Sequence, residues 1–69
     1  MKEIEITTDY IKLDQFLKLC SAVQTGGQAK IMIAEGMIKV NDNVAFERGK
    51  KIRKNDIIDI KDYEKFIVI

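Results

Sequence analysis

The chain has 69 residues, of which 46% are hydrophobic and 33% charged, with four glycines and no proline. This composition is typical of one small folded domain and excludes a disordered or low-complexity chain. The net charge is only +1, which taken whole argues against a strongly basic tail. With no histidine and one cysteine, Ser-His and Cys-His catalysis and the usual zinc sites are excluded. We therefore expect no enzyme activity, no metal and no cofactor.

The first residues do not resemble an export signal. Residues 1–5 lack the apolar core of a signal peptide, and no uninterrupted apolar run exceeds four residues. Cys20, the only cysteine, cannot form an intramolecular disulfide. We expect a cytoplasmic protein without a membrane segment.

Hydrophobic periodicity predicts a strand and then a helix in the first third of the chain. Residues 3–7 alternate charged and apolar side chains, as a strand with one buried face does. A helical stripe with spacing i, i+3, i+4 and i+7 follows, made of Leu13, Phe16, Leu17 and Cys20. Thr8 and Asp9 are candidate N-caps for this helix. On its surface, Asp14 and Lys18 are spaced as an i, i+4 ion pair.

A second helix is predicted after a turn at residues 25–27. Thr25 is the candidate N-cap, and Gly36 stands where a left-handed C-terminal cap is expected. Between them, Ala29, Met32 and Ile33 have helical spacing. We expect two helices of about ten residues each, joined as a helical hairpin.

The second half of the chain predicts short strands separated by turns. Ile38 and Val40 begin a strand, and the residues of the 41–43 turn tolerate positive φ before Val44 starts a return segment. A second turn at residues 53–56 precedes a strand through Ile58 and Ile60, and residues 65–69 form a strand that could pair with residues 3–7. The fold class expected is α+β: one domain, residues 1–69, with a two-helix hairpin packed on a small antiparallel sheet.

The charges are unevenly distributed along the chain. Residues 1–9 carry one cation against three acids and residues 55–69 two against four, whereas residues 10–54 carry nine against four. Within this middle part, residues 48–54 hold five cations in seven positions. Such a run is either a solvated turn or a set of phosphate ligands.

Several fragments together resemble the S4-type RNA-binding domain, named after the fourth protein of the small ribosomal subunit. They are Lys12-Leu13-Asp14 on the first helix, Ala29-Lys30 on the second, Gly36 to Asn41 at the helix-to-strand joint, and Lys51 to Ile58. The similarity spans about residues 10–60. The 25–30 turn and the Arg48-Gly49-Lys50-Lys51 run look like those of small stand-alone bacterial members.

The resemblance implies a non-catalytic protein that binds structured RNA, such as rRNA or a tRNA-like fold. It places Lys12, Lys30, Lys39, Asn41 and Arg53 on or near the RNA, and the charge pattern adds Arg48, Lys50 and Lys51. Many family members begin the second helix with Ser-Arg, where this chain has Thr25-Gly26. The N–H groups of Gly27 and Gln28 could bind a phosphate there instead, or the segment is an ordinary helix start.

Some alternatives remain open at this point. Asn41 is a turn residue that could also contact RNA, and Tyr10 and Tyr63 could stack on bases but lack an interleaved aromatic platform. A different class of function is a protein-interaction or assembly factor that docks an acidic partner through the same basic face, aided by a C-terminal strand with a free edge. We expect a monomer, no small-molecule substrate and no membrane partner.

Overall fold

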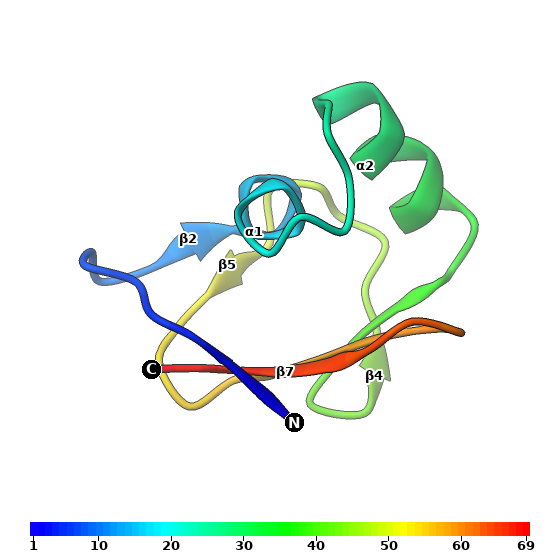
Figure 1. Ribbon diagram of the computed structural model, residues 1–69. Helices are drawn as coiled ribbons and strands as arrows, with labels where there is room; N and C mark the ends of the chain where they lie inside the picture. The colour runs from blue at the N-terminus through cyan, green and yellow to red at the C-terminus, as the bar shows by residue number, and fades with distance from the viewer.

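Two helices, α1 (Leu13–Leu19) and α2 (Gly26–Ala34), lie on one side of a five-stranded sheet in the computed structural model, which describes residues 1–69 (Figure 1). The strands follow the order β1-β7-β6-β3-β4. Their bounds are β1 Lys2–Ile4, β3 Ile38–Val40, β4 Asn43–Val44, β6 Ile57–Ile60 and β7 Lys65–Val68. This arrangement confirms the α+β fold with both helices on one face of the sheet.

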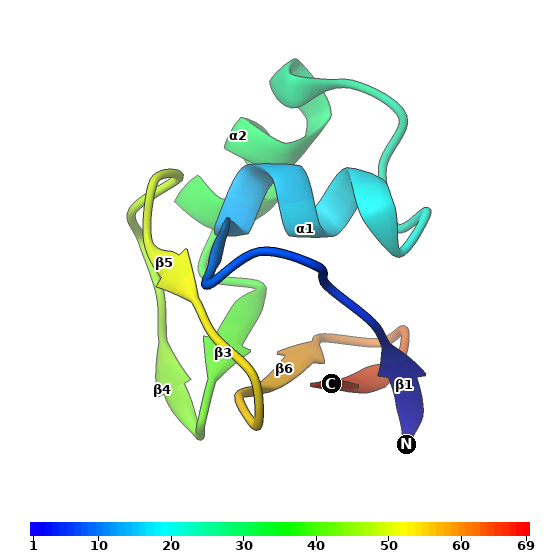
Figure 2. The same ribbon diagram turned by 90° about the vertical axis from the view of Figure 1, so that its left-hand side faces the viewer.

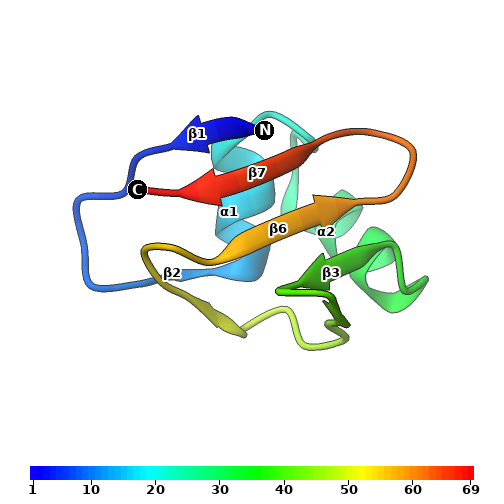
Figure 3. The same cartoon turned by 90° about the horizontal axis from the view of Figure 1, so that it is seen from below.

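The two ends of the chain pair with each other, as predicted, but in parallel. Glu3 stands opposite Ile67 in this pair, whereas the other strand pairs of the sheet are antiparallel. The first strand ends at Ile4, earlier than predicted. Since β7 lies between β1 and β6 (Figure 3), the C-terminal strand offers no free edge. The expectation that it could dock a partner by its edge is therefore wrong.

A second, two-stranded sheet was missed by the sequence analysis. It pairs β2 (Ile11–Lys12) with β5 (Lys51–Ile52) in antiparallel orientation. We call it the β2–β5 ribbon. Strands of two residues leave too little periodic signal to be recognised before their partner is known.

The β2–β5 ribbon also explains how α1 begins. The N–H groups of Leu13 and Asp14 donate to the carbonyls of Lys50 (2.9 Å) and Arg48 (3.1 Å), so neighbouring backbone satisfies the first turn of the helix. The residue at the N-cap is Lys12, whose side chain makes no capping bond. The prediction of Thr8 or Asp9 as N-cap is therefore wrong. The Thr8 hydroxyl instead donates to the Tyr10 carbonyl at 2.7 Å.

The caps of α2 are as predicted. The Thr25 side chain accepts from the Gln28 N–H at 3.1 Å in a capping box, and Gly36 has φ +72° just beyond the last turn. The turn residues Asn41 and Asn55 also adopt positive φ, +51° and +77°. Both helices are shorter than ten residues, α1 most clearly, with seven.

The core lies between the helices and the inner face of the sheet. It consists of fifteen buried residues, all hydrophobic, and Phe16 of α1 meets Phe66 of β7 edge to face at 6.0 Å between centroids. Cys20, Met32 and Met37 are partly buried against it. Neither helix is long and apolar enough to cross a membrane.

Candidate nucleic-acid interface

The β2–β5 ribbon has one buried and one exposed face. Ile11 and Ile52 stand opposite each other, with Ile52 fully buried, and the next pair, Lys12 opposite Lys51, is exposed. Because side chains alternate along a strand, Lys12 and Lys51 share the face away from the core. This register brings Lys12, from the motif at the start of the first helix, beside the basic run, so that both contribute to one surface.

An aromatic ring lies beside the cations at one end of the ribbon. The Lys51 ammonium is 4.9 Å and the Arg53 guanidinium 5.6 Å from the centroid of the Tyr10 ring. Both distances are in the range of cation–π interactions, in which the ring attracts a cation that keeps its full charge. Tyr10 thus holds Lys51 and Arg53 in place.

A groove of about 480 Å³ opens between the β3–β4 hairpin and β5. Figure 2 shows these two parts side by side, with the β4–β5 connection rising beside α2. We call it the basic groove. Its lining includes three cations of the 48–54 run, two carboxylates, two asparagines and an exposed aromatic ring: Lys50, Lys51, Arg53, Glu47, Asp56, Asn41, Asn43 and Phe46.

The floor of the basic groove is fixed by a hydrogen-bond network between two turns. Asn41 donates from Nδ2 to Asp56 Oδ1 at 3.0 Å and accepts from the Ile57 N–H at 2.9 Å. The second oxygen of Asp56 accepts from the Arg53 N–H at 2.8 Å. Both Asp56 oxygens are thus engaged within the chain, and the turn carrying Arg53 is tied to the hairpin. Asn41 acts first as a structural clamp, and its RNA contact stays a prediction.

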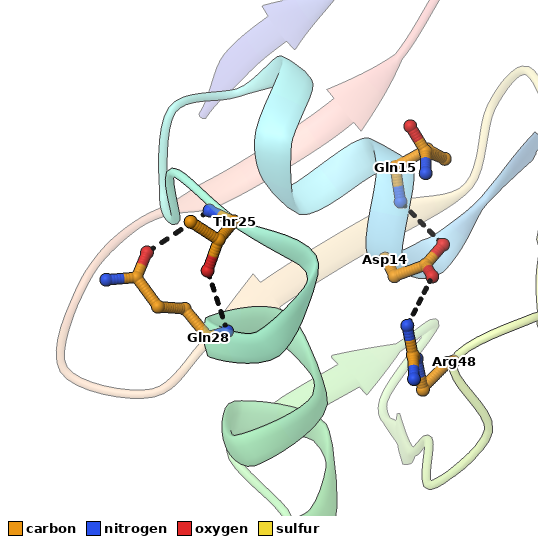
Figure 4. A network of polar contacts seen from close by, with 5 residues as sticks. All are labelled: Asp14, Gln15, Thr25, Gln28 and Arg48. Carbon is orange, nitrogen blue, oxygen red and sulfur yellow. Dashed lines mark hydrogen bonds and ion pairs between the residues drawn. The ribbon is translucent and has the colours of Figure 1, made fainter.

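Most cations of this surface have no acidic partner. The structure contains two ion pairs within 4 Å, Lys2 with Glu64 (3.3 Å) and Arg48 with Asp14 (3.6 Å). Asp14 therefore pairs with Arg48 and not with Lys18, and its Oδ1 also accepts from the Gln15 N–H (Figure 4). The cations of the β2–β5 ribbon and the basic groove remain without a carboxylate at ion-pair distance, which favours an external anion.

Arg48 lies at the other end of the loop, against the start of α2. Its Nη2 stands 3.7 Å from the position that a Cβ on Gly26 would occupy. Lys30 is one helical turn beyond Gly26 and projects from the same side of α2. Arg48 and Lys30 thus extend the cationic surface from the groove onto the second helix.

The predicted phosphate site at the start of α2 is partly wrong. The Gln28 N–H is occupied by the Thr25 hydroxyl, and the Gln28 side chain accepts from the Thr25 N–H at 3.3 Å (Figure 4). The same side-chain oxygen also accepts from the Gln24 N–H at 2.7 Å. The N-cap interaction satisfies this donor before any ligand does. The Gly27 N–H makes no hydrogen bond within the chain, so its phosphate contact stays a prediction.

Lys39 is not among the residues that line the basic groove. It projects from the outer face of the sheet, directly opposite Asp59 on β6, and lines a separate recess with Lys61. Phe46, which was not predicted from the sequence, is 65% exposed and lines the basic groove. Its signal was an isolated aromatic residue shortly before a cationic run.

Comparison with known proteins agrees with the fold described above. The family model of the S4 domain matches residues 4–69. The chain is a member of the S4 domain family. At the family level this is a ribosome-related RNA-binding domain, which confirms the resemblance noted in the sequence.

Two relatives show how far this similarity extends. A probable ribosome maturation protein of Bacillus subtilis, RlbA, is 39% identical over 66 residues, which cover 96% of this chain and 93% of that protein. The crystal structure of the 30S ribosomal protein S4e from Thermoplasma acidophilum shares the fold, with a TM-score of 0.67 at 21% identity. That match covers 91% of this S4-family chain but only 33% of the larger protein.

Proposed function

We propose that this protein binds structured RNA, without catalysis and as a monomer, through the β2–β5 ribbon and the basic groove. The observation that carries the proposal is the cluster of cations without carboxylate partners on one side of the fold: Lys12, Lys50, Lys51 and Arg53. Lys30 extends it along α2, and Arg48, although paired with Asp14, adds its charge at the start of that helix. Phosphate groups supply the opposite charge that the chain itself does not provide.

The name of the relative from Bacillus subtilis suggests the biological setting. With 39% identity over nearly the whole of both chains, we propose that this protein also acts in ribosome maturation, on ribosomal RNA in the cytoplasm. A-form RNA has a deep, narrow major groove that side chains read poorly. The proposed contacts are therefore to phosphates and to the shape of the fold, with little sequence readout.

The test is binding of ribosomal RNA fragments by the wild-type chain and by a Lys50→Glu, Lys51→Glu double variant. Each lost phosphate contact reduces the number of counterions that are released on binding. The variant should therefore bind at least tenfold more weakly at low salt and show a shallower salt dependence. For the wild type, about five contacts predict a slope near −4 in log K against log salt.

The matched control is Lys2→Glu with Lys65→Glu, which changes the net charge equally but lies around a separate recess beside Tyr63. We expect this control to retain most of the affinity. Equal weakening by both variants would mean that only net charge matters. Absence of wild-type binding at low salt would refute the proposal, and an association with cell proteins that survives nuclease treatment would then favour docking of an acidic partner.

A further inference from the structure

We propose that Phe46 is a stacking position for one unpaired RNA base, beside the cations that hold the neighbouring phosphate. This inference rests on the proposed RNA binding and adds to it which feature of the RNA the basic groove binds. The preferred ligand is a structured RNA with a bulged or flipped-out nucleotide, in place of an uninterrupted helix.

The position of Phe46 distinguishes it from an ordinary exposed hydrophobic residue. Single apolar side chains on a surface are common and need no function. Phe46, however, is 65% exposed and lines the same groove as Lys50, Lys51 and Arg53. An open ring and uncompensated cations in one groove match the two parts of a nucleotide, a flat base and a charged phosphate.

The ring of Phe46 is held by its edge. Its Cε1 and Cζ lie 3.5 and 3.7 Å from the position that a Cβ on Gly36 would occupy, so this edge of the ring packs beside Gly36 while the rest stays exposed. The preceding residue, Ala45, is buried, and its N–H donates to the Ile38 carbonyl at 2.9 Å. A ring positioned in this way loses little conformational entropy when a base stacks on it.

Phe46 is a better stacking position than Tyr10. The Tyr10 ring already has Lys51 and Arg53 beside it, and it is 37% exposed. Phe46 has no cation–π partner among the contacts of the chain. Of the exposed rings near the cations, Phe46 is therefore the one left open for a base.

Other groups in the basic groove set the orientation of the nucleotide. Glu47 also lines the groove and repels a phosphate, so the phosphate belongs on the side of Lys50 and Arg53. Asn43 donates from Nδ2 to the Asn41 carbonyl at 3.2 Å, which leaves its Oδ1 free to accept a hydrogen bond from a base edge. Stacking itself tolerates any base, because every base has a π face.

The absence of tryptophan from the chain allows a direct test. A Phe46→Trp variant is titrated with an RNA hairpin that contains a single-nucleotide bulge, and with the same hairpin fully paired. We expect quenching of the tryptophan fluorescence by the bulged hairpin and little by the paired one. Tyr63→Trp, an exposed ring in a separate recess, is the matched control and should report no quenching.

Affinity measurements with Phe46→Ala and Phe46→Tyr complete the test. Loss of the ring should weaken binding of the bulged hairpin by roughly five- to a hundredfold and of the paired hairpin less than about twofold, while Phe46→Tyr retains the preference. Equal effects on both hairpins, or no quenching at position 46, would overturn the stacking proposal and leave RNA binding intact. If the wild-type chain binds neither hairpin at low salt, both proposals fail.

Discussion

The outer face of the five-stranded sheet and the exposed face of the β2–β5 ribbon use their charges in opposite ways. On the sheet, Lys39, Asp59 and Lys65 alternate in sign across three neighbouring strands. On the ribbon, Lys12 stands directly opposite Lys51, a like-charge pair that destabilises a sheet. Departures from local stability rules are expected where a partner supplies the missing interaction, so this pair supports the proposal that RNA binds at the ribbon.

Among single charge changes, the largest expected effect comes from Lys12→Glu, which creates an opposite-charge pair with Lys51. This change removes one cation and neutralises another, so RNA affinity should fall by about thirtyfold, while the free energy of unfolding rises by a few tenths of a kcal/mol. Filter binding and urea denaturation measure the two effects.

The mirror-image control for that variant is Lys65→Glu, which places a like charge opposite Asp59 on the sheet. It should lower stability by a similar few tenths of a kcal/mol and leave RNA affinity within about twofold. If both variants changed affinity and stability in the same direction, the contrast between the two faces would not hold.

The next effect concerns the clamp beneath the basic groove. Asp56→Ala removes the acceptors for the Asn41 amide and the Arg53 N–H, and should cost about 1–3 kcal/mol of stability. Although the change deletes an acid near the proposed RNA, we expect affinity to fall, because the turn carrying Arg53 loosens. Asp59→Ala, which breaks no hydrogen bond of the chain, is the control for both measurements.

A smaller effect is expected at the cap of α2. Thr25→Ala removes the oxygen that accepts from the Gln28 N–H and should lower the free energy of unfolding by about 1 kcal/mol, whereas Thr25→Ser should restore it. Thermal unfolding measures this cost. An RNA affinity that changed more than stability would indicate that the start of α2 contacts RNA.

The smallest expected effect concerns the reactivity of Cys20, which is partly buried at the C-terminal end of α1, away from the ribbon. Burial raises the pKa of the Cys20 thiol, so less of the reactive thiolate forms near neutral pH. Iodoacetamide should modify Cys20 more slowly in the folded chain than in the denatured one, and faster as pH rises. Equal rates followed by mass spectrometry would show that the thiol is not protected.

Local patterns predicted most of the fold, because they depend on neighbours in the sequence. The cap at Thr25, the left-handed Gly36 and the turns at Asn41 and Asn55 were all recognisable from residue type and spacing. The start of α1 was not, since its first N–H groups are satisfied by carbonyls of Lys50 and Arg48, far along the chain.

The sequence by itself determined the two helices, the sheet on which they pack, the family and the basic middle segment. Each of these depends on local periodicity, turn chemistry or charge. The tertiary structure decided which cations stand together. Register placed Lys12 beside Lys51, strand alternation placed Lys39 on the outer face of the sheet, and packing of one edge beside Gly36 left Phe46 largely exposed in the groove. Pairing between distant strands has no local signal, so the binding surface emerges only once the chain has folded.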